Sequence, residues 1–338
     1  MRKSIYFIAF FLSGILLSCN TCNKEKNKFT KVELSKEDTF TVKINRYEKD
    51  LFGVSLKTLE KDLKVLQPKY RFFLDGNLND PSNLAQIKSY LTDPLILNLY
   101  EDCMKKYPDV NDLDASFTKA FRFFRHYYPE KKMPKVYTYI SGMDSEMPVK
   151  YADSVLIVAL DMYMGSSYKN YKMLGLPVYR LYRLRKESIL PDCMKEIART
   201  LVDNSKENKN FLDYILYEGK ILYFLDATLP DTPDSLKINY TSKQMDWCKT
   251  NESNVWSFII NKKILYSQET TIIMKLLADG PFTAVFSKQS PSKVGVWIGW
   301  QIIRAYMDEN ESVTIKELFQ DQDSKKILNK SKYKPKKE

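Results

Sequence analysis

The stretch ILPDCMKEIARTLVDNSKENKNFLDYILYEGKILYFLD, residues 189–226, predicts two helices joined by a polar turn. The first helix carries one apolar stripe with spacings of three and four residues: Met194, Ile197, Ala198, Leu201 and Val202. Pro191 and Asp192 mark its start, and the polar run 203–210 ends it. The second helix, residues 211–225, is apolar almost all round. We therefore expect it to be a buried helix at the centre of the fold.

Three charged side chains stand on these predicted helices. Glu218 lies in the middle of the apolar second helix, where a carboxylate is costly unless it is paired or bound to a metal. Arg199 and Asp203 are four residues apart, so their side chains are neighbours on a helix. We expect Arg199 to hold Glu218 as a buried ion pair, with Asp203 completing the cluster. Removing one partner of such a pair typically costs about 3–5 kcal/mol.

This pair of helices resembles the core of the gluzincin metallopeptidases, in which a helix bearing HExxH precedes a helix with a third glutamate ligand. In that register Arg199 stands at the first histidine, Thr200 at the general base, Asp203 at the second histidine and Glu218 at the third ligand. The chain has a single histidine, His126, so no two-histidine site can form. Arg199 also places a fixed positive charge where the metal would lie. The resemblance implies a degenerate core, and we expect no bound metal and no enzyme activity.

Composition sets broad limits on the protein. The 338 residues are 44% hydrophobic, which is enough for a large core, and the formal net charge is +11. Lysines and arginines are scattered along the chain, so the charge indicates a solvated basic surface. We expect no nucleic-acid partner. Binding of lipid or glycan polyanions is an alternative function that the composition allows.

The N-terminus predicts a lipoprotein signal peptide. Arg2 and Lys3 precede the apolar run 5–17, which is typical of a secretory signal and too short for a membrane-spanning helix. The sequence around the end of this run, Leu16-Leu17-Ser18-Cys19, resembles the bacterial lipobox, whose cysteine is acylated and becomes the first mature residue. The predicted organisation is a signal peptide at 1–18, lipidated Cys19 with a flexible tether over 19–38, and one globular domain over 39–338. The covalent lipid on Cys19 is the only cofactor expected.

An exported chain is in a compartment where disulfides can form. With Cys19 lipidated, four cysteines remain and allow three full pairings: Cys22, Cys103, Cys193 and Cys248. Because Cys22 lies in the predicted tether, buried free thiols are favoured over a complete set of disulfides.

The remaining elements predict a small sheet followed by many helices, an α+β fold that is predominantly α-helical. Strands are expected at 40–44, 136–140 and 154–160, with a loop over 141–153. Helices are expected at 56–70, 84–91, 94–107, 112–128, 241–247, 254–265 and 294–307, with a short one after Thr314 and a basic tail over 325–338.

The last long predicted helix is rich in glycine and tryptophan. Gly295 and Gly299 allow another helix to approach closely. Trp297 and Trp300, together with Asp161 after the last strand, are candidate cleft-lining residues, although a core position is favoured for the tryptophans.

Several stretches stand out in order along the chain: the lipobox, LDMYMG at 160–165, YEGKILYFLDATLPD at 217–231, QMDWCKTNESNVW at 244–256, SPSKVGVWIGWQIIRAYM at 290–307 and ILNKSKYKP at 327–335. Together they resemble the GldB gliding-motility lipoproteins of Bacteroidetes over most of the mature chain. The resemblance implies an envelope lipoprotein that serves gliding and the associated secretion machinery, with no established catalytic activity.

Three readings of the function follow. The favoured one is a non-catalytic lipoprotein, a pseudo-peptidase that binds an envelope protein in its former cleft. The second is a hydrolase whose unusual metal site uses Asp161, Asp203 and Glu218, oxygen ligands that suit magnesium, calcium or manganese better than zinc. The third is the polyanion-binding module. We expect a periplasm-facing protein anchored in a membrane, and the sequence leaves open its partner, its oligomeric state and which membrane holds it.

Overall fold

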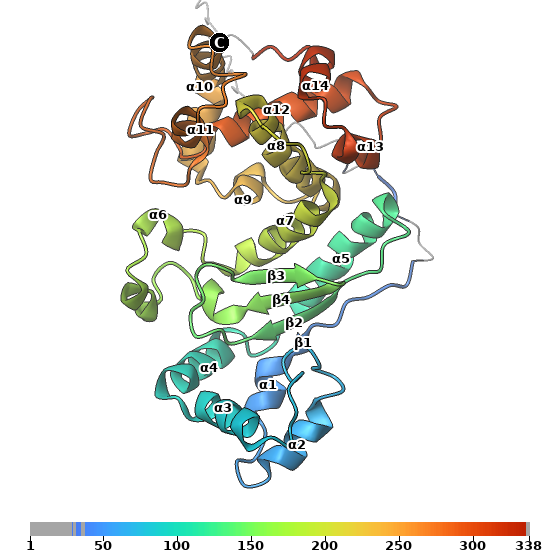
Figure 1. Ribbon diagram of the computed structural model, residues 1–338, viewed down its shortest axis with the longest axis vertical. Coiled ribbons are helices and arrows are strands. Elements are labelled where there is room, and N and C mark those ends of the chain that lie inside the picture. Colours follow the sequence, from blue (N-terminus) through green and yellow to red (C-terminus); the bar gives the residue numbers. More distant parts are fainter. Residues whose placement is uncertain (1–28, 30–31, 35–37, 336–338) are drawn as a thin grey trace, which may run out of the picture.

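The computed structural model describes residues 29, 32–34 and 38–335. The predicted signal peptide, Cys19, Cys22 and most of the predicted tether lie outside these residues. Figure 1 shows an elongated molecule with a small sheet across its middle, a group of short helices on one side and the longer helices on the other. The predicted α+β class with a helical majority is confirmed.

The sheet has four strands in the order β1-β2-β4-β3: β1 (Asn45–Arg46), β2 (Lys135–Tyr139), β4 (Val155–Ala159) and β3 (Val149–Ala152). β1, β2 and β4 are parallel, whereas β3 pairs antiparallel with β4 at the sheet edge. The predicted loop 141–153 was wrong because it contains β3. Asp153 and Ser154 form a two-residue hairpin turn with positive φ at both positions.

The predicted strand 40–44 is also wrong. Val42 and Ile44 are buried in an extended segment that precedes the two-residue strand β1. Their backbone N–H groups donate to side chains of α5 (Asn111–Tyr127), to Thr118 Oγ1 at 2.8 Å and to Asp114 Oδ1 at 2.8 Å. Since helix side chains satisfy these donors, the segment needs no neighbouring strand.

Four short helices pack on one side of the sheet: α1 (Tyr47–Phe52), α2 (Leu59–Leu66), α3 (Pro81–Thr92) and α4 (Pro94–Lys106). α3 and α4 begin with proline after an aspartate cap, Asp80 and Asp93, whose side chains accept backbone N–H bonds. The predicted helix 56–70 is shorter than expected, and Leu56 is exposed.

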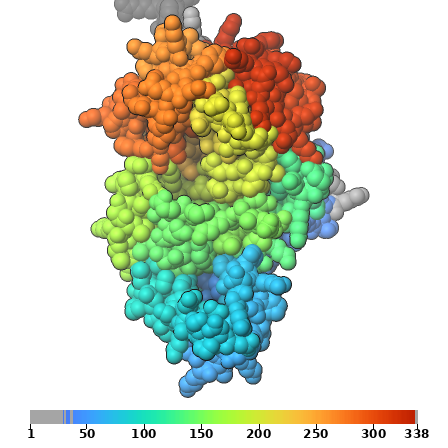
Figure 2. Space-filling view, in the orientation of Figure 1, coloured from blue at the N-terminus to red at the C-terminus, as the bar shows by residue number. Residues whose placement is uncertain are grey.

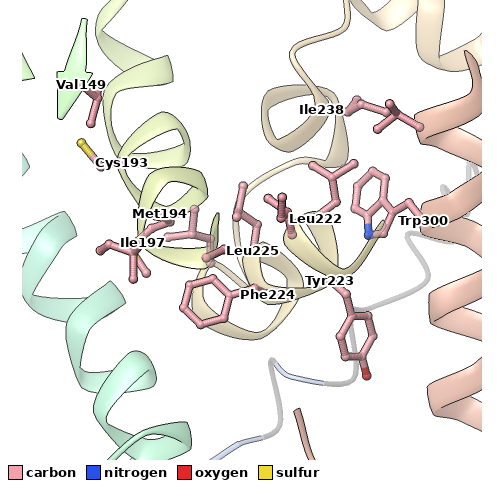
Figure 3. Packing of buried hydrophobic residues seen from close by; sticks show 14 of the residues in the cluster. Val149, Cys193, Met194, Ile197, Leu222, Tyr223, Phe224, Leu225, Ile238 and Trp300 are labelled. Atoms are coloured by element: carbon pink, nitrogen blue, oxygen red, sulfur yellow. The ribbon is translucent and has the colours of Figure 1, made fainter. Parts of the chain in front are cut away.

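The main core lies around α7 (Ile189–Leu201), α8 (Phe211–Thr228) and α12 (Val294–Glu309). Figure 3 shows Met194 and Ile197 of α7 on one side of α8 and Trp300 of α12 on the other. α8 is buried along most of its length, as predicted. Further helices surround this core: the 20-residue α10 (Ser242–Asn261) and the shorter α6 (Val178–Leu181), α9 (Asp234–Ile238), α11 (Thr270–Leu277), α13 (Ile315–Gln320) and α14 (Ser324–Ser331), with 3-10 turns η2 (Leu160–Tyr163), η3 (Lys169–Leu174) and η4 (Lys186–Ser188).

Glycines bring α8 and α12 into backbone contact. A Cβ atom added at Gly299 would lie 1.8 Å from the carbonyl oxygen of Ile215. A Cβ added at Gly219 of α8 would lie 2.5 Å from the carbonyl oxygen of Gly299. The close helix approach predicted at Gly299 is therefore confirmed.

A buried ionic network joins α8, α9 and α12. Asp226 is 2% exposed and accepts bonds from Lys237 Nζ at 2.9 Å and from Arg304 Nη2 at 2.7 Å. Trp300 Nε1 donates to the other carboxylate oxygen at 2.9 Å, and Arg304 also bonds Asp234. Burial alone would raise the pKa of Asp226, but the two cations outweigh it and hold that pKa below its ordinary value.

Two helical regions differ from the sequence prediction. The predicted helices 241–247 and 254–265 are one continuous helix, α10, which runs without a break through the polar residues between them and ends at Asn261. The predicted basic tail contains α14, which Asp323 caps and which buries Ile327. The capping boxes at Thr241 and Thr314 form as the sequence indicates.

Phe29 packs against the main core although it precedes the predicted domain. Its side chain is 9% exposed and lies edge-on to Tyr127 and Tyr223, with ring centroids 6.0 and 5.5 Å away. The predicted tether over 19–38 is therefore not free along its whole length.

The described residues include three of the cysteines and all of the helices considered as possible membrane spans. Cys103, Cys193 and Cys248 are buried free thiols, as the sequence favours. Among the described helices, none is both long and apolar enough to cross a bilayer.

Candidate functional site

The predicted ion pair forms between α7 and α8. Arg199 Nη1 lies 3.1 Å from Glu218 Oε1, and Arg199 Nε lies 3.4 Å from Glu196 Oε1. The predicted third member, Asp203, is absent from this cluster. α7 ends at Leu201, and Val202 has extended backbone with ψ 122°, so Asp203 is no longer on the helical face of Arg199. Glu196, three residues before Arg199 on the same helix, takes the place assigned to Asp203.

This cluster is more open to solvent than the sequence indicates. The side chains of Arg199, Glu218 and Glu196 are 38%, 31% and 39% exposed. The expectation of a buried pair was wrong because Glu218 lies on the narrow part of α8 that the core leaves uncovered. An ion pair with this much solvent contact contributes about 0–1 kcal/mol to stability. Partial burial nevertheless raises the pKa of Glu196, against the lowering effect of Arg199.

Asp203 lines a small pocket beside the α7–α8 loop. It accepts a bond from the Ser205 N–H at 2.9 Å and a short one from Gln322 Nε2. Charged residues of both signs line this pocket: Asp203, Lys206, Lys209, Asp213, Lys220 and Asp321. The predicted base position, Thr200, is exposed, and its hydroxyl donates to the Ile197 carbonyl on its own helix.

Lys220 is the buried cation of the pocket. It is 5% exposed, and Nζ donates to the backbone carbonyl of Asp321 at 2.6 Å. Asp213 is instead paired with Lys206, and Asp321 with Lys326. Burial of the ammonium lowers the pKa of Lys220 to about 8, although the carboxylates of Asp321, Asp203 and Asp213 oppose this shift.

Lys220→Met is expected to stabilise the protein at neutral pH. The pKa of Lys220 falls from its ordinary 10.5 to about 8 on folding, so burial of the charge opposes folding by up to about 3 kcal/mol below pH 8. The variant also loses the hydrogen bond to Asp321, which lowers its stability by about 1 kcal/mol. The net increase in the free energy of unfolding is therefore about 2 kcal/mol. The gain should shrink as pH rises from 8 to 10.5, because the folded wild type then loses the proton from Lys220 while the unfolded chain keeps it, so the burial penalty on the charge disappears.

Urea denaturation of both proteins across pH 7–10.5 measures this difference. Lys64→Met on the exposed side of α2 controls for removal of a surface lysine. A variant less stable than the wild type at pH 7, with a difference independent of pH, would show that the Lys220 bond outweighs its burial.

The three candidate cleft-lining residues are buried in the core. Trp297 and Trp300 are 4% and 0% exposed, so both tryptophans occupy the core position that the sequence analysis favoured for them. Asp161 is also 0% exposed, and it accepts bonds from the backbone N–H groups of Ser141 and Met143 at 2.9 and 2.6 Å. Asp161 therefore fixes the loop after β2, and burial raises its pKa.

The oxygen ligands proposed for a hydrolase are not brought together. Asp161 lies under the β2 loop, Asp203 faces Gln322, and Glu218 pairs with Arg199. Within residues 29, 32–34 and 38–335, no three histidine, cysteine, aspartate or glutamate side chains are arranged to hold a metal. His126 is exposed at the end of α5.

The sequence prediction overlooked Glu196 and Lys220. Glu196 lies three residues before Arg199 on an amphipathic helix, and this spacing was sufficient to predict that the two side chains pair. Leu216 and Phe224 lie one helical turn to either side of Lys220, and this pattern predicts that Lys220 lies on a buried face of the helix.

Residues 26–335 match the model of a family described as gliding motility protein GldB. No curated protein and no solved structure matches the chain.

Proposed function

Because this chain belongs to the GldB family of gliding motility proteins, we propose that it is a lipid-anchored envelope protein that binds a protein of the motility apparatus without catalysing a reaction. The family match covers nearly all of the described chain, and the N-terminal lipobox supports the anchor. Chemical cross-linking of the anchored protein in motile cells, followed by affinity capture, should recover a specific envelope protein. Recovery of no specific envelope protein would contradict the partner-binding role.

One observation carries the non-catalytic part of this proposal. On the face shared by α7 and α8, the carboxylates of Glu218 and Glu196 are both engaged by the guanidinium of Arg199. Arginine keeps its charge at all physiological pH values, so it opposes a metal ion and cannot act as a general base there. Ion-paired side chains open to solvent suit recognition of a partner.

We also propose that β3, α7 and α8 derive from a gluzincin metallopeptidase core that has lost its metal site. An antiparallel edge strand, β3, packs beside α7, and α8 follows with Glu218 facing Arg199; Figure 1 shows β3 next to α7. The gluzincin arrangement consists of an edge strand, a helix with the first ligands and a second helix with the third ligand, in this order along the chain. The early end of α7 departs from it, because the second ligand position, Asp203, lies outside the helix.

Glu218→Gln is expected to leave motility unchanged. The amide keeps the shape of the side chain but cannot serve as a carboxylate ligand or as a base, and the lost ion pair is too exposed to affect folding by more than about 1 kcal/mol. Colony spreading of a gliding host with its own copy deleted gives the readout, with protein abundance measured by immunoblot. Glu196→Gln is the matched control on α7. Loss of spreading at normal abundance with Glu218→Gln alone would favour a catalytic carboxylate.

Cys19→Ala is expected to abolish the membrane anchor. Lipidation at Cys19 would create both the processing site and the anchor, so the variant should persist as a larger precursor or leave the membrane fraction. Membrane fractionation, gel mobility and labelling with a fatty-acid analogue measure this outcome. Cys22→Ala is the control, which should be processed and anchored normally. Normal size and fractionation of Cys19→Ala would contradict the lipid anchor.

We also propose that the domain faces the periplasm. The chain after Cys19 has a single acidic residue, Glu25, before the described part begins, so it lacks an acid-rich export signal. Protease treatment of intact cells should leave the domain uncut, and its removal would place it on the cell surface instead.

A further inference from the structure

Residues 166–187 form a protruding segment that leaves the sheet after η2 and returns at α7. It contains η3, the short helix α6 and the turn η4. Figure 1 shows the segment projecting to the left of the sheet, and Figure 2 shows it in yellow-green at the edge of the molecule. Arg183 fastens its base through two bonds to Asp279, at 2.9 and 2.8 Å. The segment is therefore a supported projection and not a loose loop.

The outer part of the protruding segment exposes apolar side chains. Val178 is 83% exposed and Met173 is 67% exposed. Met147 in the neighbouring loop is 56% exposed, and Arg180 connects that loop to α6 by donating to the Ser145 carbonyl at 3.1 Å. Three apolar side chains thus face solvent on adjoining parts of the surface, where they add nothing to the core.

Cations surround these apolar side chains. The protruding segment has six lysines and arginines and one acidic residue, Glu187, and acidic residues of neighbouring segments pair with Arg180, Arg183 and Lys186. Lys172 is exposed, and Lys169 is 70% exposed with its ammonium 3.9 Å from Asp102. Three tyrosines lie between the cations in the sequence, and of these Tyr179 and Tyr182 are partly exposed whereas Tyr171 is buried. Exposed apolar side chains flanked by lysine, arginine and tyrosine are typical of a surface that enters the headgroup region of an anionic membrane.

We propose that the protruding segment docks on an anionic lipid surface, with Met173 and Val178 in the headgroup–acyl boundary and the neighbouring cations against lipid phosphates. A bilayer fits this surface better than a protein does. Stable protein interfaces bury about 800 Å² on each partner around a well-packed centre, and a few separate aliphatic side chains on a narrow projection do not supply that.

The docking rests on the proposed lipid anchor, which keeps the domain near a membrane. A single weak contact then becomes effectively intramolecular, so modest attraction is sufficient. Lysine and arginine near an anionic bilayer each contribute attraction worth about fivefold in binding. The anchor and the protruding segment would together act as two points of attachment.

A polarity-sensitive fluorophore at residue 178 tests the docking. The full lipid-anchored chain with Cys22→Ser and Val178→Cys is labelled and placed in vesicles of phosphatidylcholine, with or without phosphatidylglycerol. Labelling should be selective, because Cys103, Cys193 and Cys248 are buried and burial raises the pKa of each thiol. We expect a blue shift in the anionic vesicles that weakens with salt, and about fivefold weaker docking after Lys172→Gln.

The control is Val65→Cys on α2, which is 73% exposed and lies at the far end of the molecule from α6. It should show no shift in either vesicle. Equal shifts at both positions, or none at position 178, would overturn the docking. A shift that requires an added envelope protein and does not occur with lipid alone would assign the surface to a protein partner. Co-sedimentation with phosphatidylcholine vesicles reports the lipid anchor separately, so failure of the anchor and failure of the docking are distinguishable.

Discussion

Gly299→Ala is expected to destabilise the protein by about 3 kcal/mol or more, enough to unfold a large fraction of a marginally stable domain. The added methyl group would lie 1.8 Å from the Ile215 carbonyl oxygen and 2.4 Å from its carbonyl carbon. Both are backbone atoms of α8, so no side-chain rotation relieves the overlap and the two helices must separate. Separation removes packing along the largest helix contact of the core.

Urea denaturation and protein abundance in cells measure this effect. Gly280→Ala is the matched control, because its added Cβ would lie 3.7 Å from the nearest neighbouring atom. The control should change stability by less than about 1 kcal/mol. A loss below 1 kcal/mol for Gly299→Ala would mean that α8 and α12 are farther apart in solution than in the structure.

Asp226→Asn is expected to cost about 3–5 kcal/mol at neutral pH. The change removes the nearer of the two carboxylates that pair with Lys237, which is 1% exposed, and leaves it only Asp234 at 3.7 Å. It also weakens the bond network of Arg304. The new amide also points donor hydrogens toward groups that are themselves donors, including Trp300 Nε1. A buried cation left with only its more distant carboxylate, together with a mispaired donor, makes this loss much larger than that of a surface ion pair.

The pH dependence has a definite sign. The pKa of Asp226 is below its ordinary value in the folded protein, so its contribution is present above pH 4 and disappears as pH falls through the folded pKa. The stability difference between wild type and Asp226→Asn should therefore narrow in acid. Asp231→Asn, whose pair with Lys119 is exposed, is the control and should cost less than about 1 kcal/mol. Similar losses in both variants would refute the buried network.

Periodicity was informative where burial is nearly complete or strictly one-sided. The stripe on α7 and the all-round apolar character of α8 predicted both helices within a few residues. Gly299 was recognisable because a glycine in an apolar helix costs stability unless another backbone comes close. The pairing of Arg199 with Glu218 also followed from the sequence, since these charges had few other partners within reach of that helix pair.

The sequence was less informative where tertiary contacts decide. β3 is four residues long and includes Lys150, so its sequence pattern resembles that of a loop. It is a strand because it pairs with β4 in the folded protein. The exposure of Glu218 depends on which side of α8 the surrounding helices leave open, and helical periodicity does not contain that information. Asp203 was misplaced because one residue of extended backbone at Val202 changes the direction of every side chain that follows.

In the proposed lipidated form, the contact of Phe29 with the core would limit how far the domain can move from its anchor. With the lipid on Cys19, ten residue steps lie between the bilayer and the point where the chain joins the core, and these span at most about 35 Å when fully extended. A compact domain of this size is about 50 Å across. The linker in this proposed form would be shorter than the domain is wide, so it would restrict the orientations that the domain can adopt above the membrane. A pull from a bound partner would be transmitted to the core through the Phe29 contact after only a short extension.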